Sequence, residues 1–410
     1  MTEAQSAIEF SHVDILFGGT GRKGARARAE AMQLMDQGLS RDEILARTGV
    51  VMGVKDASLT VREGEICVLM GLSGSGKSTL LRAVNGLNPV TRGKVLVKNE
   101  DKTVDIASCD SVTLRFMRTR RIAMVFQQFA LLPWRTVREN VGLGLELRGL
   151  GAAERRRIVD KNLKLVALDK WADKYARELS GGMQQRVGLA RAFATDADIL
   201  LMDEPFSALD PLIRTKLQDE LLAVQKEVKK TIIFVSHDLD EALKLGNQIA
   251  ILEGGRIIQA GSPEDIVLTP ANDYVREFVQ HMNPLNVLRA RTFMKPVAGL
   301  PAQGDALLVE ATRAILLRGG DSLSTASLSM HGAPVPLAEI GTDGGPPPAG
   351  HCAAVSQEAT MKTVIQLRQA TGLPVLMTAG SRIVGVCGED EILHALASEG
   401  WQKMQAEAAD

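Results

Sequence analysis

The chain carries Gly71-Leu72-Ser73-Gly74-Ser75-Gly76-Lys77-Ser78-Thr79 between an apolar run and a helix-like segment. The apolar run, residues 66–70, predicts a buried strand, and residues 80–84 predict a helix. A glycine turn in this setting points backbone N–H groups inward, and the helix start adds about half a positive charge, so the turn suits a polyanion. The arrangement predicts a nucleotide site in which Lys77 reaches the terminal phosphates and Ser78 binds Mg²⁺. A glycine turn without a ligand is the disfavoured alternative.

The bulk composition limits the number of domains and the kinds of partner. A length of 410 residues predicts two or three domains. Charged residues make up 24% of the chain and nearly cancel to a formal net charge of -1. No global basic field is available for DNA, RNA or an anionic membrane surface, which argues against nucleic acid as the main partner.

The four cysteines lack the CxxC spacing of zinc or redox sites. They are Cys67, Cys109, Cys352 and Cys387. Free thiols in a reducing compartment are therefore expected. The sequence shows neither a signal-peptide pattern nor an apolar stretch of about 18 residues, so we expect a soluble cytoplasmic chain unless a partner holds it at a membrane.

Two strands are predicted before the phosphate loop, with a helical insertion between them. Residues 8–17 and 54–61 alternate apolar and polar, which is typical of half-buried strands. Residues 21–49 predict two short helices, the second opened by a capping box of Ser40 and Glu43. The insertion carries a basic run, for which a solvated helix face is favoured over phosphate or lipid-headgroup contact. This run is Arg22, Lys23, Arg26 and Arg28.

Polar groups follow several apolar runs beyond the loop. Residues 199–202 predict a strand buried on both faces that ends in Asp203 and Glu204, where open α/β sheets place their chemistry. Residues 231–235 predict another strand, followed by His237. Before them, Leu179-Ser180-Gly181-Gly182 leads into a helix-like segment and predicts a second phosphate-binding element, with an ordinary helix cap as the alternative.

The ordered motifs resemble those of the ATP-binding cassette (ABC) ATPases over about residues 5–282. The resemblance implies an α/β phosphate-loop NTPase domain at residues 1–282, with a RecA-like core, an antiparallel β subdomain and an α-helical subdomain at about residues 128–195. A carboxy-terminal α+β domain would occupy residues 283–410.

The resemblance also implies an ATPase with ATP and Mg²⁺ as cofactors. Asp203 would hold Mg²⁺ through water, with Ser78 and Gln127 as the other metal-site residues. Glu204 would polarise the attacking water, while Gln127 and His237 would contact or sense the γ-phosphate. The implied nucleotide-binding residues are Phe17, Gly71, Leu72, Ser73, Gly74, Ser75, Gly76, Lys77, Ser78 and Thr79.

In this family the missing face of the site comes from a second copy, which implies a homodimer. Ser180, Gly181 and Gly182 of one subunit would cap the ATP at Lys77 of the other, and Asp210 would couple the two sites. The alternatives are an N-cap for Ser180, a core-edge carboxylate for Asp203 and a packed imidazole for His237.

Two positions depart from the family pattern. Met183 replaces the usual glutamine in the signature but leaves Ser180 and Gly182 intact. The adenine-stacking aromatic, usually tyrosine, has Phe17 as its candidate; an ordinary core phenylalanine is the alternative.

A narrower resemblance is to the ATPase subunits of quaternary-amine importers for glycine betaine, proline betaine or choline, most of all the choline branch. It implies a pair of membrane permease subunits, an external solute-binding protein and a peripheral place on the cytoplasmic face of the inner membrane. The apolar run Phe129–Trp134 suits a groove for a permease helix, with a buried internal loop as the alternative. The stretches that carry this resemblance are residues 38–45, 53–59, 124–133, 208–214 and 272–275.

Beyond the cassette, Asn283-Pro284 predicts a hinge and residues 341–350 predict a linker. A helix at residues 361–367, a strand-turn-strand pattern at 374–386 and a helix at 389–397 resemble half of a cystathionine-β-synthase (CBS) module. Residues 291–296 are the candidate start of a degenerate first half. A regulatory nucleotide or ionic-strength sensor and a dimerisation module without ligand are equally favoured, and no ligand residues are assigned.

Four other functions are weighed against quaternary-amine import. An importer for another small solute shares every motif. A soluble ABC ATPase acting on DNA or ribosomes usually has two cassettes or a coiled-coil insert, and this chain has neither. A phosphate-loop kinase leaves the Leu179–Gly182 signature and His237 without a role, and exporters are typically fused to membrane spans.

Overall fold

The chain forms two compact units, residues 1–280 and 281–410. In the first unit, the strand that leads into the phosphate loop lies inside a six-stranded sheet. The computed structural model describes residues 5–280, 285, 287–304, 306–310, 315–319, 322–341, 345 and 347–395. The predicted Asn283-Pro284 hinge lies outside them. All four cysteines are free, and Cys67, Cys352 and Cys387 are buried.

The six-stranded sheet has the order β10-β9-β3-β8-β7-β6, with β10 antiparallel to β9 and the other neighbours parallel. Every residue of β3, β7 and β8 is buried, as expected for parallel strands covered on both faces. The strands are β3 (Ile66–Met70), β6 (Ile122–Val125), β7 (Ile199–Asp203), β8 (Thr231–Val235), β9 (Gln248–Glu253) and β10 (Arg256–Gly261).

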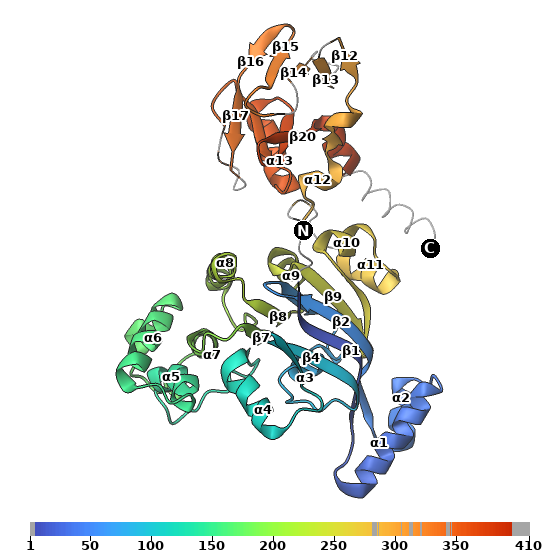
Figure 1. Cartoon of the computed structure of the whole chain (residues 1–410), viewed down its shortest axis with the longest axis vertical. Helices are drawn as coiled ribbons and strands as arrows, with labels where there is room; N and C mark the ends of the chain where they lie inside the picture. Colours follow the sequence, from blue (N-terminus) through green and yellow to red (C-terminus); the bar gives the residue numbers. More distant parts are fainter. Residues whose placement is uncertain are drawn as a thin grey trace. The chain divides into compact units, whose positions relative to one another are not determined.

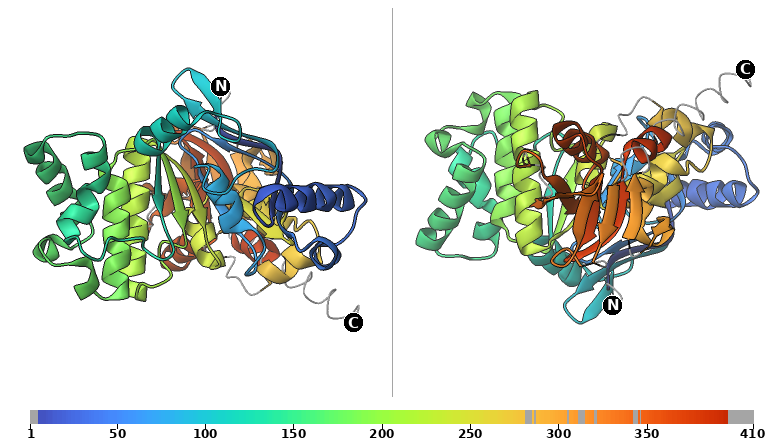
Figure 2. Two further views of the ribbon diagram at one scale, coloured as in Figure 1. Left: turned by 90° about the horizontal axis from the view of Figure 1, so that it is seen from below. Right: turned by 90° about the horizontal axis from the view of Figure 1, so that it is seen from above.

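A second, antiparallel sheet of the first unit has the order β2-β1-β4-β5. Its strands are β1 (Ser6–Phe17), β2 (Val51–Arg62), β4 (Arg92–Asn99) and β5 (Lys102–Asp105). Helices α1 (Gly21–Asp36) and α2 (Arg41–Thr48) join β1 to β2 and project from the sheets (Figures 1 and 2). The capping box predicted for Ser40 and Glu43 is present.

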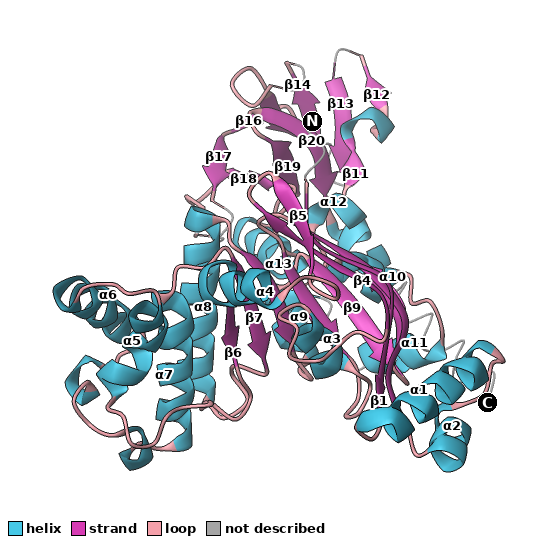
Figure 3. Cartoon of the chain, turned by 60° about the horizontal axis from the view of Figure 1, so that its bottom comes forward, coloured by secondary structure: helices cyan, strands magenta, loops and turns pink. Residues whose placement is uncertain are grey.

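The remaining helices of the first unit fall into groups (Figure 3). Helices α5, α6 and α7 pack against one another, and α7 also contacts β6; α3 and α9 contact other strands of the six-stranded sheet. The bounds are α3 (Lys77–Ala83), α4 (Ser111–Phe116), α5 (Val137–Leu147), α6 (Ala152–Leu165), α7 (Gly181–Ala194), α8 (Pro211–Val228), α9 (Leu239–Leu245), α10 (Pro263–Leu268) and α11 (Asp273–Val279). None of the helices in the described ranges is long and apolar enough to span a membrane.

The second unit contains two five-stranded sheets, ordered β11-β20-β19-β18-β17 and β12-β13-β14-β15-β16. The elements are α12 (Ala290–Phe293), β11 (Lys295–Pro296), β12 (Ala302–Gln303), β13 (Ala306–Glu310), β14 (Ile315–Arg318), β15 (Ser327–Met330), β16 (Ala333–Val335), β17 (Leu337–Ile340), β18 (Cys352–Ser356), α13 (Met361–Thr371), β19 (Val375–Ala379) and β20 (Arg382–Cys387). Residues 389–395 are helical; the rest of the predicted 389–397 helix lies outside the described range.

The structure differs from the expected first half-module at residues 291–296. Strand β11 pairs with β20, so this segment joins the same sheet as the carboxy-terminal elements. The chain then forms the antiparallel meander β12 to β16, with left-handed glycines at turns such as Gly304 and Gly332. Short strands joined by such turns favour hairpins over a strand-helix-strand repeat.

Candidate functional site

The phosphate loop is closely packed from behind and open at its tip. Gly71 and Gly76 have φ of 139° and 99°, and a Cβ on them would lie 2.1 Å from the Leu252 carbonyl and 2.5 Å from the Gly53 carbonyl. Only glycine fits both the backbone angles and the space. Gly74, with φ of 79°, has nothing within 4 Å of a Cβ position. The loop is thus held in shape from one side and can be approached from the other.

Lys77 lies across the loop and is held by backbone carbonyls. Its Nζ donates to the oxygens of Gly71 and Leu72 at 2.8 and 2.9 Å. Burial lowers the pKa of the Lys77 amino group, and the carboxylates of Glu204 and Asp203 oppose that shift. An anion in the loop offers this ammonium stronger partners than two neutral carbonyls do.

Ser78 and Asp203 meet although 125 residues separate them. The Ser78 hydroxyl donates to Asp203 Oδ1 at 2.7 Å, and Arg82 Nη2 donates to Oδ2 at 2.8 Å. Asp203 is fully buried. A buried carboxylate held by a cation and a hydroxyl is a fixed oxygen donor beside the loop.

Glu204, Gln127 and His237 form a cluster at the ends of β7, β6 and β8. Gln127 Nε2 donates to Glu204 Oε2 at 3.0 Å, and His237 Nδ1 lies 3.6 Å from the same oxygen. Glu204 has a φ of 48°, a left-handed conformation that costs a non-glycine residue about 1–3 kcal/mol. This turn directs the Glu204 carboxylate to the edge where the strand ends converge.

Phe17 ends β1 and lies next to the phosphate loop. A Cβ on Gly53 would be 2.7 Å from Phe17 Cε2 and 3.1 Å from Thr79 Cγ2, so the ring and the last loop residue flank the same glycine. Phe17 is 38% exposed. The ring therefore has an open side beside the loop, which a fully packed core phenylalanine would not have.

The Ser180–Gly182 turn and Asp210 are not joined to the loop of their own chain. Ser180 caps α7 and accepts from the Met183 N–H, and Asp210 caps α8 and accepts from the Ile213 N–H. No hydrogen bond or ion pair links Ser180, Gly181, Gly182 or Asp210 to residues 71–79, all of which the structure describes. Ser180 and Gly181 are exposed.

Three residues that the sequence analysis did not single out support this site. Arg82 pairs with Asp203, and the Tyr274 hydroxyl accepts from the Leu72 N–H at 3.3 Å. Gln185, 1% exposed, donates to the Glu204 carbonyl at 3.0 Å and accepts from the Ala208 N–H at 3.1 Å. Gln185 thereby connects the helix that follows the Ser180–Gly182 turn to Glu204.

The Phe129–Trp134 run is anchored at one end and exposed at the other. Phe129 and Ala130 have φ of 58° and 47°, and Arg191 donates to both of their carbonyls. Trp134 is 68% exposed. The run is therefore a fixed loop with an exposed aromatic side chain, which disfavours the buried-loop alternative.

A buried carboxyl lies behind His237. Ser236 Oγ donates to Glu241 Oε2 at 2.6 Å, and Gln218 Nε2 donates to Glu241 Oε1 at 3.1 Å. Burial raises the pKa of Glu241 above its usual 4.5, against the opposing effect of the Ser236 hydrogen bond. The folded chain therefore holds this proton more tightly than the unfolded chain.

We predict that Glu241→Gln changes how stability depends on pH. A raised folded pKa gives Glu241 a contribution to wild-type stability that is fully present below pH 4.5 and is lost as pH rises through the folded pKa, because the buried carboxylate must then carry charge. The variant lacks this loss. Urea unfolding over the pH range should show the free energy of unfolding of the wild type falling relative to the variant, with exposed Glu30→Gln as control. A constant difference at every pH would contradict the prediction.

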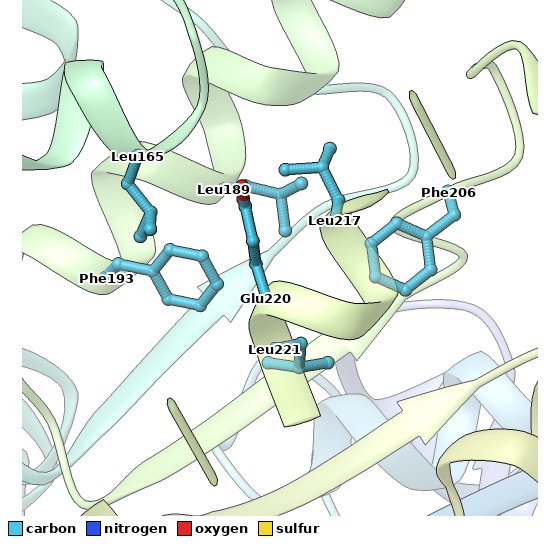
Figure 4. A pocket seen from close by; sticks show the side chains of 7 residues that line it. All are labelled: Leu165, Leu189, Phe193, Phe206, Leu217, Glu220 and Leu221. Atoms are coloured by element: carbon cyan, nitrogen blue, oxygen red, sulfur yellow. The ribbon is translucent and has the colours of Figure 1, made fainter. Parts of the chain in front are cut away.

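A small apolar cavity lies between α7 and α8, away from the loop (Figure 4). Its volume is about 10 Å³, roughly enough for one water molecule. Glu220 points into it, and burial raises the pKa of its carboxyl. The cavity is too small for a nucleotide. It is lined by Leu165, Leu189, Phe193, Phe206, Leu217, Glu220 and Leu221.

The residues present fit a nucleoside triphosphate and Mg²⁺. The Ser75 hydroxyl is buried within the loop, and its oxygen has no partner among the described residues. The Ser78 hydroxyl and the Asp203 carboxylate are the hard oxygen donors that Mg²⁺ accepts along with phosphate oxygens. Since Arg82 occupies the other Asp203 oxygen, only Oδ1 faces Ser78.

Comparison with known proteins finds similarity to ATP-binding proteins of ABC transporters. A family model described as "ABC transporter" matches residues 54–207. The chain is 53% identical over 261 residues to the glycine betaine/proline betaine transport system ATP-binding protein ProV of Escherichia coli (strain K12). This alignment covers 64% of each chain. The chain is also 48% identical over 274 residues to the glycine betaine/carnitine transport ATP-binding protein GbuA of Listeria monocytogenes serotype 1/2a (strain 10403S). That alignment covers 67% of each chain.

One solved structure extends the similarity to the fold. The dimeric structure of a bacterial ABC transporter cassette aligns with a TM-score of 0.52 at 30% identity, covering 62% of this chain and 98% of that one. The chain matches about 64% of the length of the Escherichia coli relative, less than two thirds.

Proposed function

Since the chain belongs to the ABC transporter family, we propose that it is the ATP-hydrolysing subunit of an importer for a quaternary amine such as glycine betaine or choline. The main support is the convergence of Lys77, the Ser78–Asp203 pair and the Glu204 cluster at the ends of neighbouring strands. The similarity to two betaine-transport ATP-binding proteins supports the substrate class.

Each side chain then has a role in positioning or neutralising phosphate charge. Lys77 and the loop N–H groups bind the phosphates, and Ser78, with Asp203 through water, would hold Mg²⁺. Bound Mg²⁺ would neutralise charge on the phosphate oxygens. Glu204 orients the attacking water and acts as the general base that accepts its proton.

Two groups adjoin the Glu204 carboxylate, and an aromatic ring borders the loop. Gln127 senses the metal and the γ-phosphate, and His237 donates to the γ-phosphate; in the structure both lie beside Glu204 Oε2. Phe17 stacks on the adenine with its exposed side.

We also propose that two copies share their sites. The exposed Ser180 and Gly181, with Gly182, would cap the triphosphate bound by the partner copy, and Asp210 would lie at the same seam. The similar solved cassette is a dimer by its description. A helix N-terminus that faces a bound phosphate is a favourable anion site, which supports this placement of α7.

The partners proposed beyond the dimer are membrane proteins and a binding protein. The Phe129–Trp134 loop, with Trp134 exposed, suits contact with a permease helix, at the cytoplasmic face of the inner membrane. A solute-binding protein would deliver the amine from outside. The second unit is proposed as a CBS-like regulatory domain, based on the β18-α13-β19-β20 order that ends in a helix.

We predict that vesicles containing this chain, its permease subunits and its binding protein take up a quaternary amine when ATP is supplied on the side of this chain. Uptake of radiolabelled glycine betaine, choline and carnitine would be compared with that of glycine, which lacks the trimethylated nitrogen. Glu204→Gln should abolish uptake. Transport of glycine alone would contradict the substrate class and favour another small-solute importer, whereas uptake without hydrolysable ATP would contradict the ATPase role.

A further inference from the structure

The helical arm at residues 18–50 reaches from the end of β1 to the phosphate loop. Its helices have a small core of their own with the adjoining strand ends, and polar contacts dock the arm on the antiparallel sheet. Arg92 donates to both Asp14 and Asp36, and Lys55 Nζ donates to the Met35 carbonyl at 3.0 Å. The core consists of Leu16, Ala31, Met35, Ile44, Val50 and Met52.

Arg41 joins this arm to the tip of the loop. It is the first residue of α2, directly after the Ser40 cap, and its Nη1 donates to the Gly74 carbonyl at 2.9 Å. On the packed side of the loop, the Gly255 N–H donates to the Ser75 carbonyl at 3.1 Å. Arg41 is thus a side chain from a separate element that fixes the open, left-handed tip.

Two physical effects of Arg41 favour a polyanion in the loop. A guanidinium bonded to the Gly74 carbonyl fixes the orientation of the Gly74–Ser75 peptide, whose N–H donates to the Leu72 carbonyl at 3.2 Å. The same cation adds positive charge beside the site. Together with the bonds of the Ser75 N–H and carbonyl, the Arg41 bond holds the tip before the ligand arrives, so less ordering is needed on binding.

We propose that Arg41 is a positioning residue for the nucleoside triphosphate, through which the arm sets the affinity of the phosphate loop. The arm begins directly after Phe17, whose ring lies near Thr79 at one end of the phosphate loop. Through Arg41 the arm also contacts Gly74 at the tip of the loop. This inference rests on the proposed ATP site and adds a residue to it.

The test is a titration of the full chain with MgATP, combined with kinetics. Arg41→Ala should raise the dissociation constant for MgATP about three- to tenfold, the range of a partly exposed charged hydrogen bond. It should raise KM without lowering kcat, and the melting temperature without nucleotide should be unchanged. Arg47→Ala is the matched control, because Arg47 is exposed in the last turn of the same helix. If the alanine variant is unstable, Arg41→Gln replaces it in the same MgATP titration.

The outcomes separate this inference from the proposed function. Equal affinity of the wild type and the Arg41 variants would overturn the role of Arg41 and leave the ATP site standing. An equal loss in Arg47→Ala, or a loss confined to kcat, would also overturn it. No binding of MgATP by the wild type would overturn the proposed function and this inference together.

Discussion

Replacing Glu204 with glutamine should lower ATP hydrolysis by at least about 100-fold, the lower end of what a positioned general base contributes. Glutamine keeps the size of the side chain and can still accept from Gln127, which now donates to Glu204 Oε2 at 3.0 Å. The left-handed turn at this position should also be retained. Binding should persist, because Lys77 and Ser78 are untouched. Phosphate release and an MgATP titration, measured on the same preparation, give both quantities.

The matched control is Glu154→Gln, which makes the same change on the exposed first turn of α6. It should hydrolyse ATP at the wild-type rate. Wild-type hydrolysis by Glu204→Gln would contradict the role given to this carboxylate. If ATP binding were lost along with hydrolysis, Glu204 would contribute to nucleotide binding and not to the chemical step.

The cassette fold could be predicted because the central strands appear in the sequence as short apolar runs. The runs at β3, β7 and β8 are continuously apolar, and each is buried at every residue in the structure. The resemblance to ABC ATPases implies that Ser78 and Asp203 share a metal site, and in the structure the Ser78 hydroxyl donates to Asp203 at 2.7 Å. The solved dimeric cassette agrees with this fold.

Residues that act through long-range packing were not predicted. Arg82 could have been found, because it lies four residues after Ser78 and so on the same helix face. The Arg41 contact with Gly74 depends on how the whole arm folds back, and no local pattern encodes that. The meander of the second unit was missed because its strands, such as Ala333–Val335, are too short for a clear alternation.

Replacing Ser180 with tyrosine should reduce hydrolysis by at least about 100-fold while each subunit still binds ATP, if two copies close over the nucleotide. Ser180 is exposed, so a bulky ring there meets no obstacle within its own chain. The lost hydroxyl cap of α7 costs about 1 kcal/mol of stability, which circular dichroism melting would register. The large loss must then come from the ring separating the Ser-Gly-Gly turn from the partner's triphosphate. Phosphate release by the assembled complex measures it.

Mixing two inactive variants distinguishes a site shared between copies from a site within one chain. Lys77→Ala lacks a working loop but keeps its Ser180–Gly182 turn, whereas Ser180→Tyr has the opposite defect. A mixed dimer joins the intact loop of one copy to the intact turn of the other, so one of its two sites is whole. Random pairing should therefore restore roughly a quarter of the wild-type sites, since about half of the dimers are mixed. Hydrolysis no greater than the sum of the separate variants would contradict the shared site, because each chain would then need its own turn beside its own loop.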